Sequence, residues 1–287
     1  KEWIRQGIVD VVIGDGALGD TMQQMADFRP LVKAAQDSDC RVHAAIQHRI
    51  DSDRVGDGTI EMVRAAACNY WAQGIDGLYM ARGWFYNYPY EATFYEKLRE
   101  MPQPDIMASK DKYYRLPSYG AGAKPDSGPG SRMDLPAILK LNQPAGIKFS
   151  ISDDLPRWDI VGRVYEVMLR VSITGSTELD RFSFCLNGKE LPSNMLRKIN
   201  EMIWLTGPRG GGSGGYWFVY TLNEDNWPVK GNNLLEVTLD HRDPDVISDV
   251  TVRQVELETK YLMGKNFRRG FVDPALGPYE DRVGGPW

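Results

Sequence analysis

The sequence predicts an α/β unit followed by an all-β unit. In the N-terminal third, short β-branched runs alternate with amphipathic stretches that end in Gly, which is typical of parallel strand–helix repeats. In the C-terminal half, apolar residues recur at every second position, as in antiparallel strands with one buried face. A stretch rich in Gly, Pro and Ser separates the two patterns and predicts a connecting strap.

Three strand–helix units follow one another in the N-terminal part. Each strand is an apolar run, as in a strand buried on both faces, and the helices carry an apolar stripe. Three parallel strands leave both sheet edges open, so we expect further strands before Lys1 or from another chain. The expected elements are a helix end at 1–7, strands at 9–13, 41–47 and 75–80, and helices at about 22–35, 59–73 and 91–101.

The C-terminal pattern predicts at least six antiparallel strands. Tyr165, Val167 and Leu169 alternate with polar or flexible neighbours, and Asn187-Gly188 is a strong signal for a tight hairpin turn. Strands of this kind predict a β-sandwich. The expected strands are 147–151, 165–173, 181–186, 216–222, 234–239 and 251–259.

Composition excludes several classes of function. A net charge of -5 without a Lys/Arg block argues against nucleic-acid binding, and no apolar run approaches the roughly 20 residues that span a membrane. Three cysteines and three histidines without metal-ligand spacing predict no metal site. The Gly-rich segment 207–215 lacks the phosphate-loop pattern, so we expect no cofactor. A secreted or periplasmic location is expected, with any leader lying before Lys1.

The order of these parts resembles the C-terminal portion of barrel-type glycoside hydrolases, and of related glycoside-hydrolase-like proteins, that carry an accessory galactose-binding-like β-sandwich. The resemblance implies the last units of a (β/α)8 TIM barrel followed by an antiparallel, jelly-roll-like β-sandwich. The missing N-terminal half of the barrel would belong to the same gene product or to another chain. The residues that carry the resemblance are Trp3–Asp10, Ala72–Tyr79, Phe184–Leu191 and Lys230–Leu239.

The resemblance also divides the chain into four parts. Residues 1–104 would be the last barrel units, 105–143 the strap, 144–264 the sandwich and 265–287 an extended C-terminal arm. Such an arm suits contacts between the subunits of a homo-oligomer.

The resemblance implies a glycoside hydrolase, or a close relative, that acts on a polysaccharide or glycoside. Glycosidases use two carboxyl groups as acid, base or nucleophile. The second strand ends in Gln47-His-Arg-Ile-Asp51 without a Glu, so the nucleophile of the family cannot be assigned to a residue here. This departure favours one alternative, a non-catalytic carbohydrate-binding or cell-surface protein. A structural assembly protein, with the Pro/Gly-rich tail as an arm between subunits, is the third possibility.

The candidate site residues follow the three strands. Asp15 and Asp51 are the candidate catalytic carboxylates, although Asp in such loops also caps helices or holds turns. Gln47 and His48 form a candidate donor–acceptor pair for sugar hydroxyls. Arg82 suits a carboxylate or sulfate on an acidic sugar, and an internal salt bridge is the alternative.

An aromatic cluster follows the third strand. We predict that Trp84, Tyr86 and Asn87 contact a carbohydrate ligand, because aromatic faces pack against the C–H side of sugar rings. Phe85 and Tyr88 are predicted to pack inside the protein. The alternative is that more of these rings are buried against the second unit.

Overall fold

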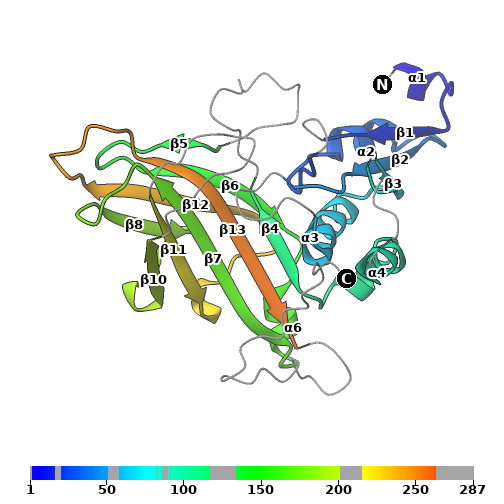
Figure 1. Cartoon of the computed structure of the whole chain (residues 1–287). Helices are drawn as coiled ribbons and strands as arrows, with labels where there is room; N and C mark the ends of the chain where they lie inside the picture. Colours follow the sequence, from blue (N-terminus) through cyan, green and yellow to red (C-terminus); the bar gives the residue numbers. More distant parts are fainter. Residues whose placement is uncertain are drawn as a thin grey trace.

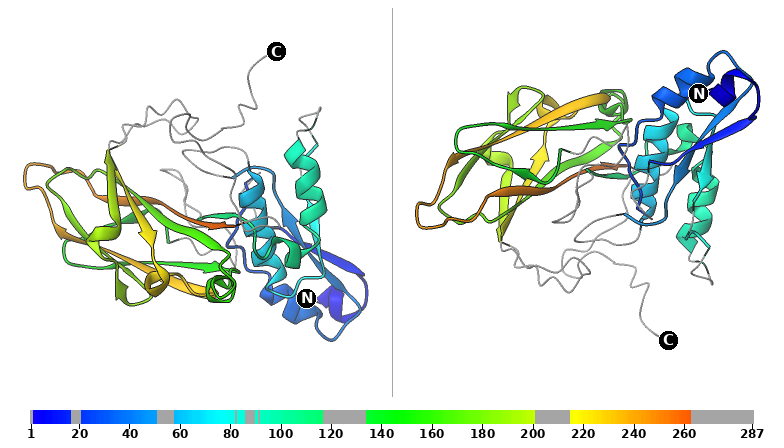
Figure 2. Two further views of the ribbon diagram at one scale, coloured as in Figure 1. Left: turned by 90° about the horizontal axis from the view of Figure 1, so that it is seen from below. Right: turned by 90° about the horizontal axis from the view of Figure 1, so that it is seen from above.

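The computed structural model describes residues 2–16, 21–50, 58–81, 83–85, 90, 92–116, 134–200 and 215–262. These residues form a small parallel sheet with helices and two antiparallel sheets that face each other (Figure 1, Figure 2). The helix α3 (Ile60–Trp71) lies between the parallel sheet and the antiparallel strands.

The parallel sheet consists of β1 (Val11–Gly14), β2 (Arg41–Ile46) and β3 (Gly77–Met80), in that spatial order. Ile13 is aligned with His43, and His43 with Gly77. Both pairings are parallel, which confirms the parallel arrangement predicted for these strands.

Among the described residues, helices cover only one face of this sheet. The side chains of Val42, Ala44 and Ile46 are buried in the core that the helices share. On the opposite face, Ile13 is 46% exposed and Tyr79 is 49% exposed. Parallel sheets are normally covered on both faces, whereas the described residues cover only one face of this sheet.

The first helices are shorter than predicted. The chain start forms α1 (Glu2–Arg5), and Gly7 follows it with a positive φ of 65°, as expected for a helix end. α2 spans only Arg29–Ala35 and not residues 22–35, because Pro30 in the first turn suits the beginning of a helix and not its interior.

The helices that follow the second and third strands are close to the prediction. Thr59 caps α3 by accepting a hydrogen bond from the backbone N–H of Met62 at 3.4 Å. α3 contributes Ala65 to the core of the antiparallel sheets and Val63 to the core of the parallel sheet. The two remaining helices of this unit are α4 (Ala92–Glu100) and α5 (Pro104–Met107).

The antiparallel strands form two sheets around one hydrophobic core. All six predicted strands are present, and alternate residues such as Val167, Leu169 and Leu235 face the core. The six-stranded sheet contains β4 (Lys112–Arg115), β5 (Ala137–Ile138), β7 (Val164–Thr174), β10 (Leu196–Asn200), β11 (Gly215–Leu222) and β13 (Thr251–Tyr261). The four-stranded sheet contains β6 (Ala145–Ile151), β8 (Arg181–Leu186), β9 (Lys189–Glu190) and β12 (Gly231–His241), and α6 (Leu155–Asp159) follows β6.

Two of the motifs that carry the family resemblance meet in the four-stranded sheet. Asn187 adopts a positive φ of 53° in the turn between β8 and β9. Its side-chain amide donates to Oδ1 of Asn233 at 2.8 Å, and its Oδ1 accepts from the backbone N–H of Leu234 at 2.9 Å. These motif residues therefore hold a turn against a neighbouring strand, which is a structural task.

A buried polar network joins the two units. The ammonium of Lys112 lies 2.9 Å from Oδ1 of Asp153, and both side chains are almost fully buried. The hydroxyl groups of Tyr114 and Tyr261 also donate to the Asp153 carboxylate. Burial, followed by the charge of Asp153, raises the pKa of both tyrosines well above the usual value. The predicted strap thus supplies β4, whose residues lie inside the fold.

The predicted fold class is wrong. The described residues are 41% strand and 22% helix, with six α-helices, and they do not form the end of a (β/α)8 barrel followed by a sandwich. A barrel closes only when each strand pairs with two neighbours, whereas β1 and β3 each pair with β2 alone in the described part of the chain. A strand–helix repeat fixes the parallel direction of strands but not the closure of the sheet.

Candidate functional site

The candidate site lies at the carboxyl ends of the parallel strands. Asp15 follows β1, Gln47 and His48 follow β2, and Trp84 lies after β3. Polar side chains at such strand ends converge on one edge of a sheet, which is where open α/β sheets bind ligands. Four predicted site residues lie outside the described residues, namely Asp51, Arg82, Tyr86 and Asn87.

Asp15 and Gln47 are in contact. Nε2 of Gln47 donates to Oδ2 of Asp15 at 3.2 Å. Gln47 is only 4% exposed, whereas Asp15 is exposed, so a buried amide orients a carboxylate that solvent reaches. The charge of Asp15 also contributes, after burial, to the raised pKa of Tyr70. Tyr70 donates to the backbone oxygen of Gln23 at 2.6 Å.

The second polar atom of the Gln47 amide is its oxygen, Oε1. Oε1 is buried and has no partner among the described residues. Turning the amide over would place this oxygen against the Asp15 carboxylate, so the hydrogen bond itself fixes the orientation. An unsatisfied buried oxygen costs about 1–3 kcal/mol, and a ligand hydroxyl that donates to it would recover that cost.

His48 is held by a glycine that follows β3. A β-carbon on Gly83 would lie 2.0 Å from Cε1 of the His48 ring, and Gly83 has a positive φ of 97°. Only glycine therefore fits at this position. The backbone oxygen of His48 accepts from the N–H of Gly58 at 2.9 Å, so the residue is fixed on two sides.

The structure reverses the prediction for two aromatic residues. Trp84 is only 5% exposed, and its Nε1 donates to the backbone oxygen of Ile46 at 2.8 Å. Phe85 was expected to be packed, but it is 58% exposed and contacts Tyr90 and Phe94 edge-on. Trp84 therefore anchors the loop to β2, and its ring is not presented to a ligand.

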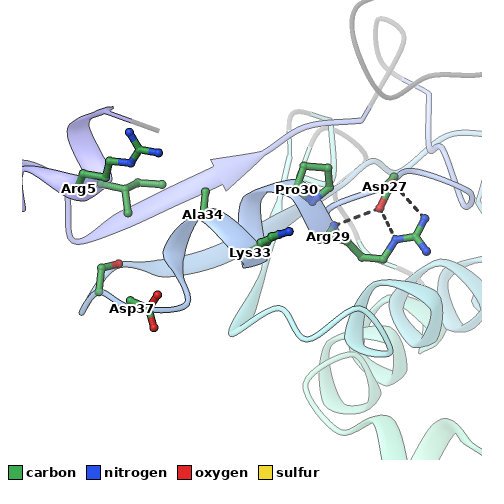
Figure 3. Close-up of a pocket in the computed structure, with 9 residues that line it drawn as sticks. Arg5, Asp27, Arg29, Pro30, Lys33, Ala34 and Asp37 are labelled. Atoms are coloured by element: carbon green, nitrogen blue, oxygen red, sulfur yellow. Dashed lines mark hydrogen bonds and ion pairs between the residues drawn. The ribbon is translucent and has the colours of Figure 1, made fainter.

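Three hollows lie away from the strand ends and share one ion pair. Figure 3 shows the largest of the three, of about 660 Å³, which is lined by Arg5 at the end of α1 and by Lys33 on α2. The other two have volumes of about 510 Å³ and 160 Å³, and Asp27 and Arg29 line all three. Nε of Arg29 is 2.6 Å from Oδ1 of Asp27, and this contact lowers the pKa of Asp27.

These hollows have no signal in the sequence. Asp27 precedes α2 and Arg29 begins it, and no sequence motif marks either charged residue. Their partners in the hollows come from β6 and β12, more than a hundred residues away in the chain. The strand register pairs Ser150 with Asn232, and the packing of the two units places both beside Asp27 and Arg29.

No group of His, Cys, Asp or Glu in the described residues is arranged to hold a metal ion. Within the same residues, no helix is long and apolar enough to cross a membrane. The comparison with protein-family models found no match, and the search of curated proteins found none.

Proposed function

We propose that the protein acts on a glycoside or polysaccharide, as a glycoside hydrolase or a close relative, at the edge formed by Asp15, Gln47 and His48. The observation that carries this proposal is the Gln47 amide. It holds the exposed Asp15 carboxylate at 3.2 Å and has a buried, unsatisfied oxygen beside it. A carboxylate next to a free amide acceptor suits a ligand that offers several hydroxyl groups.

In this function Asp15 has the role of the acid or base. A carboxylate in reach of solvent can exchange its proton, and the hydrogen bond from Gln47 to Oδ2 restricts the rotation of the Asp15 side chain. A glycosidase needs a second carboxyl group opposite the first. Asp51, which lies outside the described residues, remains the proposed partner from the loop after β2.

A non-catalytic carbohydrate-binding protein is the second candidate. Among the described residues directly following the three strands, Asp15 is the single carboxylate. One carboxylate with an amide is sufficient to bind sugar hydroxyls but not to cleave a glycosidic bond by the usual two-carboxyl mechanism. The hydrolase would cleave a glycoside and the binding protein would not, but both would bind the ligand at the same edge of the sheet.

The test is hydrolysis of a panel of polysaccharides and aryl glycosides by the wild-type protein and by Asp15→Asn. We expect the variant to lose at least about a hundredfold in kcat while KM changes little, because the charge is removed and the shape is kept. Asp10→Asn is the matched control, since Asp10 is an exposed residue near the opposite end of β1.

The outcomes separate the two candidates. Wild-type binding without hydrolysis favours the carbohydrate-binding protein. Equal turnover by wild type and Asp15→Asn removes Asp15 from the reaction and overturns the proposed hydrolase site. A thermal melting curve that matches the wild type shows that the loss of turnover is not a loss of folding.

A further inference from the structure

The two smaller hollows form one groove between the units, which we call the junction groove. Both are lined by Met25, Asp27, Arg29, Ser150 and Asn232. One wall is the segment that precedes and begins α2, and the other is the outer face of β6 and β12. None of the strand-end residues Asp15, Gln47 and His48 lines it.

The walls of the junction groove are fixed by contacts between the units. Nδ2 of Asn69 on α3 donates to the backbone oxygen of Ser150 at 3.0 Å. The backbone N–H of Ser150 donates to the sulfur of Met25 at 3.4 Å. The edge of β6 is thus held against the first unit, so a ligand would meet a groove that is already formed.

Two hydrogen-bonding groups in the groove remain available. Oδ1 of Asn232 accepts from Oγ of Ser150 at 2.9 Å, which leaves the amide NH₂ of Asn232 to donate elsewhere. That NH₂ group and the ammonium of Lys148 have no partner in the part of the chain that the structure describes. Both side chains are exposed on the outer face of the four-stranded sheet.

The charges of the groove balance. In the larger hollow, Arg29 and Lys148 face two acidic residues, Asp27 and Asp134. The Asp27–Arg29 contact neutralises one pair directly. Met25 and Leu234 add apolar surface beside these polar groups. Amide and hydroxyl donors, balanced charge and apolar patches suit a ligand that alternates hydroxyl groups with C–H surface.

We infer that the junction groove binds an extended neutral oligosaccharide and forms a second carbohydrate site that bridges the two units. The class of ligand rests on the proposed function, whereas the groove itself is independent of the strand-end site. Asn232 and Lys148 donate to hydroxyl groups of the sugar chain, and the apolar side chains contact its C–H faces.

The test is calorimetric titration of the whole chain with cellohexaose, xylohexaose, mannohexaose and, as an acidic comparison, hexagalacturonate. We expect at least one neutral hexasaccharide to bind, and Asn232→Ala and Lys148→Met each to weaken it about five- to tenfold, as for a lost hydrogen bond. Asn223→Ala is the matched control, because Asn223 is an exposed amide outside the groove whose Oδ1 accepts from Nδ2 of Asn226.

Each outcome decides the inference. Failure of every neutral hexasaccharide to bind, or equal affinity of wild type and both groove variants, overturns it. Binding of hexagalacturonate alone, with a steep loss on adding salt, overturns the neutral class. If no glycoside is hydrolysed but Asp15→Asn still binds the hexasaccharide, the inference about the groove holds and only the proposed hydrolase is refuted.

Discussion

Trp84 and Phe85 show at the scale of single residues why an aromatic cluster cannot be divided from its sequence alone. The two rings are neighbours in the chain, yet one is buried and the other is exposed. The difference arises from Gly83, whose φ of 97° turns the chain so that Trp84 reaches back to Ile46. Residue type does not report such a turn, since both rings are equally suited to packing or to binding.

Replacing these two residues gives a direct comparison. We expect Trp84→Ala to lower the free energy of unfolding by about 3–5 kcal/mol, because it empties a core position and removes the hydrogen bond to Ile46. Phe85→Ala is expected to cost about 1 kcal/mol or less, since the ring is mostly exposed. Urea unfolding measures both, and equal losses would contradict the burial of Trp84.

At the scale of elements, the parallel sheet presents two unlike faces. Strand alternation places Val42 and Ala44 among the helices and Ile13 and Tyr79 on the open face. The continuous apolar character of the strands predicts burial on both faces. The described residues bury only one of them. Both outer strands also carry backbone groups that no described strand pairs.

The two faces of the parallel sheet can be compared by introducing Thr on each of them. Val42→Thr is expected to cost about 1–3 kcal/mol, because it places a hydroxyl group at a position that is 1% exposed. Ile13→Thr should cost about 1 kcal/mol or less, because the side chain is 46% exposed and Thr keeps the β-branched shape. Chemical denaturation of the two variants distinguishes the faces. A cost for Ile13→Thr as large as that for Val42→Thr would show that the open face is covered in solution.

At the scale of the whole molecule, the Asp153 carboxylate links parts of the chain that are far apart. Lys112 and Tyr114 come from β4, and Tyr261 ends β13. The two tyrosines donate hydrogen bonds to a carboxylate, so each must keep its proton and stay neutral for the network to persist. The junction groove lies between the same two units, so its shape depends on how they are joined.

Alkaline pH tests this link. The folded pKa of Tyr114 and Tyr261 is raised above the ordinary value of 10.0, so their stabilising contribution is complete below that pH. Above it, the unfolded state loses protons that the folded state keeps, and stability falls by about 1.4 kcal/mol per pH unit for each tyrosine. We expect these phenols to ionise together with unfolding.

Phenolate absorbance and tryptophan fluorescence, followed together as the pH rises, measure that coupling. Ionisation of all 14 tyrosines while the fluorescence still reports a folded protein would contradict it. Tyr165 is 57% exposed and provides the comparison, since Tyr165→Phe is expected to leave the unfolding pH unchanged.

The strand ends contain both features that the sequence predicts and features that it does not. The position of Asp15 and Gln47 after neighbouring parallel strands follows from the repeat pattern, and the two side chains do meet. Other features of the site depend on the path of the loops, which the periodicity of the sequence does not predict. These features are the burial of Gln47, the close approach of Gly83 to His48 and the direction of Trp84. The junction groove depends in addition on the docking of two units.

By itself, the sequence determined the local structure of this protein. Apolar period and turn residues set the three parallel strands, the six expected antiparallel strands and the tight turn at Asn187-Gly188, because these signals act over a few residues. Tertiary structure alone decided the open parallel sheet in place of a barrel, the inclusion of β4 and the burial of Trp84. Those outcomes depend on which surfaces pack against each other, and that information is spread over contacts between distant residues.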